Sequence, residues 1–354
     1  MLNLSCPING LSYGLVGLNI VSSLDSMGVD FFLNTIGQTD VPIDFYKDSV
    51  KKHIDVQPYK NMPSVRIYHQ FSLIEHIGKG KHIGFPIFEL DSFNNLEIKN
   101  LSYCDEIFVC SKWAKDVILN TKELQDKKVT VVPLGVNRKI FNGNNPFIKP
   151  QKTIFINIGK MEYRKGHDLL PEIFNKAFGP NDNYELWMMA DSIFNNPVDY
   201  DKMKREYQHK LAGRVRFLSS VKSSLQVANI IKKADCGIFP TRSEGFCLPL
   251  LECLSCGIMC ISTNYSGQTE FINTKNCMLV DAKEKEKAVD NKWFHGQGNW
   301  AKITDNEIDQ FVNYVREIHS KKQSNTLHIN EEGLLTAADF SWEKTANTII
   351  SSIR

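Results

Sequence analysis

Short apolar runs alternate with helical segments along most of the chain, and this alternation constrains the fold more than any other feature. A run that is apolar at nearly every position is typical of a strand buried on both faces. Strands that alternate with helices indicate β-α units and therefore parallel sheets. The sequence predicts an α/β protein with strands at Leu2 to Cys6, Val29 to Leu33, Val65 to Tyr68, Ile83 to Phe88, Ile107 to Val109, Val129 to Val132, Thr153 to Ile158, Glu185 to Met189, Val215 to Leu218, Cys236 to Phe239, Met259 to Ser262 and Met278 to Val280.

The domain organisation follows from length and from one break in the pattern. The chain has 354 residues, which is enough for about two domains. Residues 142–150 are rich in Gly, Asn and Pro and predict a linker. We therefore expect a first domain over residues 1–145 and a second over 150–335. Residues 281–303 form the least regular part of the pattern, and within them Trp293, His295 and Trp300 come after a charged run.

Composition indicates an ordinary globular protein. With 42% hydrophobic residues, 23% charged residues and a net charge of +2, non-specific binding of polyanions is not its main activity. We find no apolar stretch long enough to span a membrane and no signal sequence, so the nine cysteines predict a reducing, cytoplasmic location. Cys253, Cys256 and Cys260 lack a second paired cluster, so small buried side chains are favoured over a zinc site.

Two glutamates, Glu244 and Glu252, mark the strongest candidate site. They lie in a run that follows a short apolar strand. Gly245 permits a tight turn, and Pro249 suits the first turn of a helix. One carboxylate is thus expected in the loop and the other in the first helical turn, both at the carboxyl end of the sheet, where α/β proteins bind ligands. Carboxylates accept hydrogen bonds from sugar hydroxyls, and a helix N-terminus attracts phosphate. The expected ligand therefore carries both sugar hydroxyls and phosphate.

This run resembles the E-x7-E motif of GT-B glycosyltransferases, above all the retaining enzymes of family 4. Four further segments resemble that family in the right order: Val132 to Phe141, Asn157 to Gly166, Asn264 to Ile272 and Phe340 to Glu343. The resemblance implies a GT-B fold, in which two Rossmann-like domains have parallel sheets facing a central cleft. It also implies that the last helix, within residues 336–354, crosses back to the first domain.

The resemblance places a nucleotide-sugar donor on the second domain. Basic side chains there match a diphosphate in charge and in the arrangement of their N–H groups, although such a cluster is often only a solvated loop. Glu252 is expected to accept from ribose hydroxyls, or to stabilise the start of its own helix. Glu244 is expected to hold the transferred sugar and to be catalytic. The expected donor-binding residues here are Lys160, which stands where many family members have Arg, together with Arg164, Lys165, Glu244, Gly245, Phe246, Leu248 and Glu252.

The first domain supplies weaker candidates. The Gly-rich segment after the first strand contains Tyr13 and Gly14, which are expected to face the diphosphate unless the segment is a plain turn. His69 ends the third predicted strand and Glu89 ends the fourth, and both are candidate catalytic residues. Glu89 stands where many family members have histidine, so that histidine's role does not transfer; strand-end caps are the alternative.

Acceptor recognition is expected between His69 and Glu89. The stretch from His69 to His82 is polar and partly basic, and Lys79 and Lys81 are its candidate acceptor-binding residues. The alternative is a short connector with a solvated, charged turn.

A metal ion is not expected. Asp199-Tyr200-Asp201 imitates the metal-binding D-x-D of GT-A transferases, but it opens a helical segment, where Asp is common for capping reasons. We therefore expect no obligatory cofactor, and a nucleotide diphosphate sugar as co-substrate.

The function predicted by resemblance is transfer of a sugar to an acceptor hydroxyl with retention of anomeric configuration. The acceptor is a glycan, a lipid-linked glycan, a protein or a modified nucleobase. Two alternatives remain: a GT-B phosphorylase or nucleotide-sugar epimerase, and a non-catalytic sugar-binding or scaffold subunit. The oligomeric state is not predicted.

Overall fold

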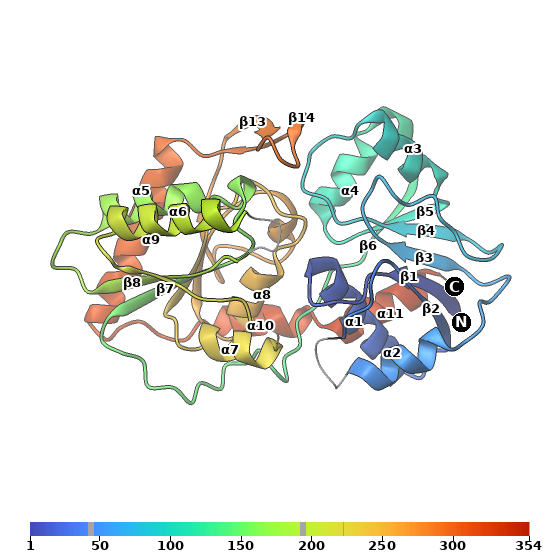
Figure 1. Cartoon of the computed structure of the whole chain (residues 1–354), viewed down its shortest axis with the longest axis horizontal. Helices are drawn as coiled ribbons and strands as arrows, with labels where there is room; N and C mark the ends of the chain where they lie inside the picture. The colour runs from blue at the N-terminus through green and yellow to red at the C-terminus, as the bar shows by residue number, and fades with distance from the viewer. Residues whose placement is uncertain (42–45, 192–195, 222, 354) are drawn as a thin grey trace. The chain divides into compact units, whose positions relative to one another are not determined.

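The computed structural model describes residues 1–41, 46–191, 196–221 and 223–353. The chain divides into two compact units (Figure 1). The first comprises Met1–Asn137 with Asp339–Arg354, and the second comprises Arg138–Ala338. Each unit contains one six-stranded parallel sheet, and all twelve predicted strands are present with ends shifted by a few residues at most. The predicted α/β class with two Rossmann-like sheets is confirmed.

The first unit is a doubly wound sheet of order β2-β1-β3-β4-β5-β6. The chain leaves β1 toward one edge and returns to the other side of β1, so the topological switch point lies between β1 and β3. Loops at the carboxyl ends of these two strands border the crevice in which such sheets bind ligands. The strands are β1 (Leu2–Cys6), β2 (Phe31–Thr35), β3 (Ser64–Ile67), β4 (His82–Phe85), β5 (Glu106–Val109) and β6 (Lys128–Val131); the helices are α1 (Ser12–Ser26), α2 (Lys47–Ile54), α3 (Asn95–Tyr103), α4 (Lys112–Leu119) and α11 (Trp342–Ser352).

The last helix of the chain, α11, belongs to the first unit and packs on α1. Ala346 and Ile349 are fully buried there. The hydroxyl of Thr345 donates to the carbonyl oxygen of Pro133 over 2.7 Å. The segment that resembled the family's closing helix is thus fastened to the first unit by apolar burial and by this hydrogen bond.

The second unit has the sheet order β12-β11-β10-β7-β8-β9, and its switch point lies between β7 and β10. Helices cover both faces: α5, α6 and α9 gather on one side, and α7, α8 and α10 on the other (Figure 1). The strands are β7 (Thr153–Ile158), β8 (Tyr184–Met189), β9 (Val215–Phe217), β10 (Cys236–Phe239), β11 (Met259–Thr263) and β12 (Met278–Val280); the helices are α5 (Leu170–Ala177), α6 (Pro197–Lys210), α7 (Ser224–Ile231), α8 (Leu248–Ser255), α9 (Asp305–Gln323) and α10 (Glu331–Asp339).

The predicted linker, residues 142–150, lies in the second unit. The side-chain amide of Asn145 donates to the carbonyl oxygen of Lys232 over 2.6 Å. The ammonium group of Lys149 donates to the carbonyl oxygen of Ala234 over 2.6 Å and also pairs with the buried Asp235. This segment is therefore fastened along the second unit at both of these points.

A β-hairpin stands where we expected the least regular part of the chain, so that expectation is wrong. Its strands, β13 (Glu284–Val289) and β14 (His295–Lys302), form a separate antiparallel sheet. β13 carries alternating Glu and Lys and has only one fully buried side chain, Ala288. It lacks the apolar run by which the other strands were recognised, and on β14 Trp300 and Ala301 are fully buried.

Three shifted boundaries affect candidate residues. β3 ends at Ile67, so His69 lies two residues beyond the strand and not at its end. β4 ends at Phe85, so Glu89 lies in the following loop and not at a strand end. α8 begins at Leu248, so Glu252 lies in the second turn of the helix and not in the first.

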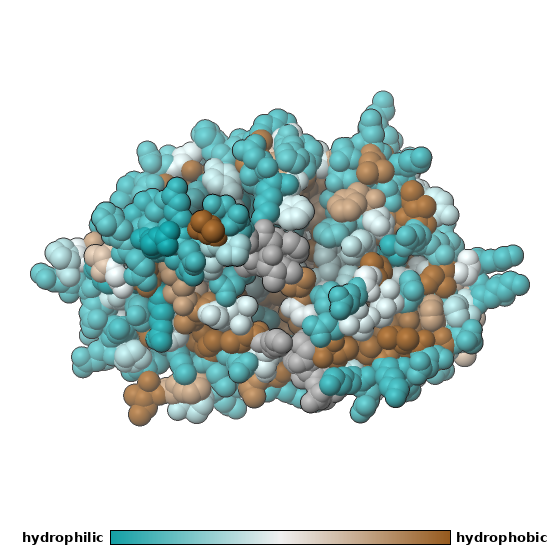
Figure 2. Space-filling view, in the orientation of Figure 1, coloured by the Kyte–Doolittle hydropathy of each residue, from teal (hydrophilic) through white to brown (hydrophobic). Residues whose placement is uncertain are grey.

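None of the helices in the described ranges is both long and apolar enough to cross a lipid bilayer. The face of the molecule in Figure 2 is largely hydrophilic, with hydrophobic side chains in smaller groups.

Candidate active site

The loops that follow β7 and β10 meet at the switch point of the second unit. The backbone N–H of Arg242 donates to the carbonyl oxygen of Arg164 over 2.7 Å. In return, Nη1 of Arg164 donates to the carbonyl oxygen of Ser243 over 2.6 Å. Gly166 has a φ of 70°, and a Cβ atom there would come within 1.8 Å of the carbonyl oxygen of Pro240. Only glycine therefore permits this approach of the two loops.

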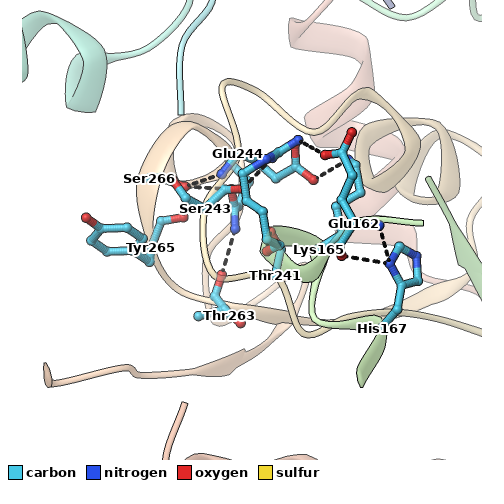
Figure 3. Close-up of polar contacts among 11 residues, drawn as sticks. Glu162, Lys165, His167, Thr241, Ser243, Glu244, Thr263, Tyr265 and Ser266 are labelled. Carbon is cyan, nitrogen blue, oxygen red and sulfur yellow. Dashed lines mark hydrogen bonds and ion pairs between the residues drawn. The ribbon is translucent and has the colours of Figure 1, made fainter. Parts of the chain in front are cut away.

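Glu244 lies at the centre of this contact (Figure 3). Its Oε1 accepts from Nζ of Lys165 over 2.6 Å, and its Oε2 accepts from Nη1 of Arg164 over 3.1 Å. The backbone N–H of Glu244 donates to Oγ of Ser266 over 2.8 Å, and its carbonyl oxygen accepts from the N–H of Gly267 over 2.9 Å. The loop after β7 thus holds the side chain of Glu244, and the loop after β11 holds its backbone.

The pairing keeps these groups charged although they are buried. Burial by itself would raise the pKa of Glu244, but the charges of Lys165 and Arg164 outweigh it and hold the pKa below the ordinary value. Burial would likewise lower the pKa of Lys165, but the Glu244 carboxylate raises it. An ionised carboxylate offers about four lone-pair positions. Glu244 can therefore hold both cations and still accept a hydrogen bond from a ligand hydroxyl.

The backbone around Glu244 contains two left-handed residues that are not glycine. Cys247 has a φ of 67° and Ser266 a φ of 64°. Such conformations cost on the order of 1 kcal/mol each and cluster at functional sites. The chain bends at Gly245 and Phe246, where a turn was expected, and the positive φ of this loop lies at Cys247. Gly245 and Phe246 are buried, and the Phe246 ring packs on Phe271 with centroids 5.1 Å apart.

Lys160 and Leu248 border the same loops. Lys160 is half-buried in the loop that follows β7. Leu248 is the first residue of α8, Pro249 is the second, and among the described residues no side chain caps this helix N-terminus. A helix N-terminus without a cap can bind an anion through its backbone N–H groups.

Glu252 differs from Glu244 because it has no charged partner. Burial raises its pKa to about 7. Within the part of the chain that the structure describes, no group donates a hydrogen bond to this carboxylate. The alternative role, stabilisation of its own helix start, loses support because α8 has no acidic residue in its first turn. A half-buried carboxylate of this kind is suited to accept from ligand hydroxyls.

Sequence reasoning missed three residues that shape the site. Ser266 orients the backbone of Glu244, and it lies within one of the segments that resembled the family. Glu162 accepts from Nη2 of Arg164 over 2.8 Å. His167 is buried with Nδ1 3.1 Å from the carbonyl oxygen of Glu162, and burial lowers its pKa to about 4, so the ring is neutral at pH 7. Glu162 also lies within a segment that resembled the family, whereas nothing in the local pattern distinguishes His167 from a residue of a solvated loop.

In the first unit, Tyr13 and His69 come together at the switch point between β1 and β3. Their ring centroids are 4.7 Å apart. The hydroxyl of Tyr13 donates to the carbonyl oxygen of Ile87 over 2.7 Å and accepts from the Ile87 N–H over 2.9 Å. Burial and then the charge of Glu89 raise the pKa of Tyr13 well above its ordinary value. The structure thus places Tyr13, His69 and Glu89, three of the six candidates from this unit, near one another.

Gly14, the fourth candidate, lies in the first turn of α1. A Cβ atom at this position would come within 2.2 Å of Oδ1 of Asn9 and within 2.4 Å of its carbonyl oxygen. Close packing of α1 against the preceding loop therefore explains this glycine without any ligand.

Lys79 and Lys81 lie near the amino ends of the strands. The ammonium group of Lys81 donates to the carboxylate of Glu106, a fully buried residue at the start of β5 that also pairs with Lys128 over 3.1 Å. Lys79 is exposed, and its backbone N–H donates to the carbonyl oxygen of Lys60 over 2.6 Å. The structure does not bring these lysines to the carboxyl edge that carries His69, which removes the geometric reason for an acceptor role.

The D-x-D sequence has a local explanation. Asp199 lies in the first turn of α6, which is capped by the side chain of Asn196, and Asp201 pairs with Lys204 over 2.6 Å. Among the described residues there is no group of three His, Cys, Asp or Glu side chains placed to hold a metal ion. The nine cysteines are buried free thiols.

Comparison with solved structures identifies the architecture. Sucrose-phosphate synthase from Thermosynechococcus elongatus superposes with a TM-score of 0.71 at 14% identity, over 99% of this chain and 97% of the other. The chain has the GT-B fold. A second GT-B structure, Anabaena Alr3699/HepE in complex with UDP and glucose, superposes with a TM-score of 0.69 at 13% identity, over 99% of each chain.

Sequence comparison agrees with this GT-B assignment. Residues 139–293 match the family model "Glycosyl transferases group 1". The GPI3 subunit of phosphatidylinositol N-acetylglucosaminyltransferase from Saccharomyces cerevisiae (strain YJM789) is 23% identical over 245 residues, which are 62% of this chain and 53% of that protein. The chain therefore spans about half the length of this curated relative. The resemblance to GT-B glycosyltransferases is confirmed; membership of family 4 and retention stay predictions.

Proposed function

We propose that this protein transfers a sugar from a nucleotide diphosphate sugar to an acceptor hydroxyl, with retention of anomeric configuration. One observation carries the proposal. Glu244 is held between Lys165 and Arg164 at the switch point of the unit that matches the group 1 family. Buried cations and a carboxylate at the carboxyl ends of β7 and β10 suit a ligand with phosphate and hydroxyl groups.

The donor diphosphate would contact Lys160, Arg164 and Lys165, together with the N-terminus of α8. These positive groups would stabilise the charge that develops on the diphosphate as it leaves. The ribose hydroxyls would donate to Glu252, which has no partner of its own in the described chain. That a GT-B neighbour binds UDP and glucose supports a nucleotide and a sugar as ligands of this fold.

The chemical step would exchange one bond at the anomeric carbon. The bond to the diphosphate oxygen breaks, the bond to the acceptor oxygen forms on the same face, and the acceptor proton passes to the departing diphosphate. Glu244 would hold sugar hydroxyls while this charge develops, so its contribution is greatest in the transition state. His69 and Glu89 remain candidates for orienting the acceptor, which we place on the first unit.

The acceptor class stays open among glycans, lipid-linked glycans, proteins and modified nucleobases. The yeast relative is named as part of a phosphatidylinositol N-acetylglucosaminyltransferase. A lipid-linked hydroxyl is therefore the first acceptor class to test.

The test is a donor screen in which products are identified by mass spectrometry. The wild-type protein is expected to consume one nucleotide sugar, and Glu244→Gln is expected to lower kcat by more than it raises KM, because it removes charge that acts mainly in the transition state. Glu172→Gln is the matched control, since Glu172 pairs with Lys176 at the surface. Wild-type turnover in the Glu244→Gln variant would contradict the assigned role.

The same screen separates the alternatives. A phosphorylase would release sugar phosphate when inorganic phosphate is the acceptor, and an epimerase would return an isomeric donor of unchanged mass. The relative's designation as a subunit gives weight to a non-catalytic role. In that case no donor would be consumed, and a pure scaffold would show no thermal stabilisation by any nucleotide.

A further inference from the structure

Arg242 lies two residues before Glu244, and neither the donor nor the acceptor needs it in the function proposed above. Its side chain is buried, with 4% exposed. Nη1 and Nη2 donate to the two carboxylate oxygens of Asp168, each over 2.8 Å. Nη1 also donates to the carbonyl oxygen of Tyr163 over 2.7 Å, and Nε donates to Oε1 of Glu286 over 3.0 Å.

These contacts leave Arg242 unsuited to bind phosphate. A guanidinium group has five N–H donors, and four of the five are committed to protein oxygens by these bonds. The group also lies over the ring of Tyr163, with Cζ 3.7 Å from the ring centroid. Arg242 thus differs from Lys165, whose partner in the structure is the candidate catalytic carboxylate itself.

Arg242 joins its own loop after β10 to two segments that are distant in sequence, the basic loop after β7 and the β13–β14 hairpin. Asp168 and Tyr163 flank Arg164 and Lys165 in the basic loop, and Glu286 lies on β13 of the hairpin. The backbone makes the same connections, because the Arg242 N–H donates to the carbonyl oxygen of Arg164 over 2.7 Å and its carbonyl oxygen accepts from the Ala301 N–H over 3.0 Å. The loop that carries Glu244 is therefore held between the basic loop and the hairpin.

The hairpin has other contacts as well: Nζ of Lys285 on β13 lies 5.8 Å from the ring centroid of Tyr265. β13 is mostly exposed, and its fully buried side chain is Ala288. On β14, Trp300 is fully buried and its ring approaches those of Tyr163 and Phe294, with centroid distances of 6.3 and 5.0 Å. Tyr163 thus contacts both Arg242 and Trp300, so the hairpin and the basic loop share one anchoring point.

We infer that Arg242 is a positioning residue that clamps the β13–β14 hairpin onto the basic loop and thereby sets the geometry of Lys165 and Glu244 for the donor. The inference rests on the proposed function for its consequence, but the clamp itself does not depend on which sugar is transferred. Loss of the guanidinium would leave Asp168 and Glu286 without their shared cation and release both sides of the Glu244 loop. Misplacement of catalytic groups by about 1 Å is enough to cost a large factor in rate.

The experiment compares Arg242→Ala, Arg242→Lys and Glu286→Gln with a control from the same hairpin, Lys302→Ala. Lys302 pairs with Glu284 over 2.7 Å at the surface of the hairpin. The probes are UDP and inorganic pyrophosphate, with affinities measured by calorimetry. Amide hydrogen exchange and thermal unfolding are recorded on the same samples, and kcat and KM on the donor from the screen.

We expect Arg242→Ala to weaken the affinity for both probes by about tenfold and to lower kcat further, because misplaced groups hurt most in the transition state. Arg242→Lys keeps the charge but loses the planar fork, so it should recover only part of the loss. Glu286→Gln should have a smaller effect of the same kind. Faster exchange should be confined to the basic loop, the Glu244 loop and the hairpin, and Lys302→Ala should match the wild type.

A purely structural role would lower the thermal midpoint and speed exchange throughout the second unit, with normal probe affinity and kcat in the folded protein; that result would overturn the inference. Normal kcat in a folded Arg242→Ala variant would do the same while leaving the glycosyl-transfer proposal intact. If the wild type consumed no donor, the proposed function would fail, and probe affinity and exchange would still decide the clamp. Should Arg242→Ala fail to fold, Arg242→Lys and Glu286→Gln carry the same test.

Discussion

The two switch points of this molecule are built from different chemistry. In the second unit, between β7 and β10, Glu244 is paired with Lys165 and Arg164. In the first unit, between β1 and β3, Tyr13 contacts His69, which in turn stacks on Phe71 with centroids 5.1 Å apart. Equivalent positions in two similar sheets thus carry buried charge in one case and aromatic rings in the other.

This difference in chemistry predicts how each switch point responds to an amino-acid substitution. A buried charge depends on its partner, because removal of one member leaves the other in a poorly solvated place. Ring contacts are weaker and less directional, so the loss of one polar atom beside them costs little. We therefore expect the charged switch point to be far more sensitive to substitution than the aromatic one.

The largest effect is expected for Lys165→Ala. It removes one of the two cations that hold Glu244, and with it a predicted phosphate contact. The affinity for a nucleoside diphosphate should fall by about 100-fold, equivalent to about 2.7 kcal/mol, while affinity for the nucleoside is nearly unchanged. Calorimetry with both ligands measures this, and Lys176→Ala, at a surface ion pair with Glu172, is the control. Equal losses for both ligands would place Lys165 away from the phosphates.

The next effect concerns pH and Glu252. Its folded pKa is about 7 against an ordinary value of 4.5, so between these values the folded protein binds more protons than the unfolded chain. This group's contribution to stability must therefore fall as pH rises from about 4.5 to 7 and stay level above that. Nucleotide affinity should rise with pH through 7, because the ionised carboxylate of Glu252 is a stronger hydrogen-bond acceptor than the protonated carboxyl group.

Glu252→Gln should remove both of these pH dependences. Calorimetric titrations and thermal unfolding across that pH range measure them. An unchanged pH profile in the variant would show that another group is responsible.

A smaller effect is expected in the first unit for Tyr13→Phe. The ring contact with His69 remains, but Ile87 loses two hydrogen bonds to the hydroxyl. The free energy of unfolding should fall by about 1 kcal/mol. Donor affinity should be unchanged because the hydroxyl is bonded to Ile87, which counts against the diphosphate contact expected for Tyr13 from the sequence. Urea denaturation measures the first and calorimetry the second, with Tyr103→Phe at an exposed tyrosine as control. A large loss of donor affinity would erase the contrast between the two switch points.

No effect is expected from chelation. If Lys165, Arg164 and the N-terminus of α8 balance the diphosphate charge, sugar transfer should proceed unchanged in EDTA, and Asp199→Asn and Asp201→Asn should have wild-type activity. Loss of activity in EDTA that manganese or magnesium restores would show that a divalent ion shares this charge.

Much of the fold could be predicted because the signals are local. A buried strand of a parallel sheet can be predicted from a run of adjacent apolar residues. The strands Thr153–Ile158 and Cys236–Phe239 have the same first and last residues in the structure as in the prediction. The hairpin could not be predicted in this way. In the structure Trp300 approaches Tyr163 and Glu286 accepts from Arg242, and these partners lie far away in sequence.

The candidate site shows the same division. The sequence alone determined that the runs around Lys165 and Glu244 belong to strand-ending loops, since each follows an apolar strand. Only the tertiary structure decided that Glu244 pairs with Lys165, a residue 79 positions away. It also decided that Lys81 pairs with Glu106 at the amino ends of β4 and β5, away from the carboxyl edge that carries His69. The physical reason is that burial pattern is a property of neighbouring residues, whereas the partner of a buried charge depends on which loops the sheet order brings together.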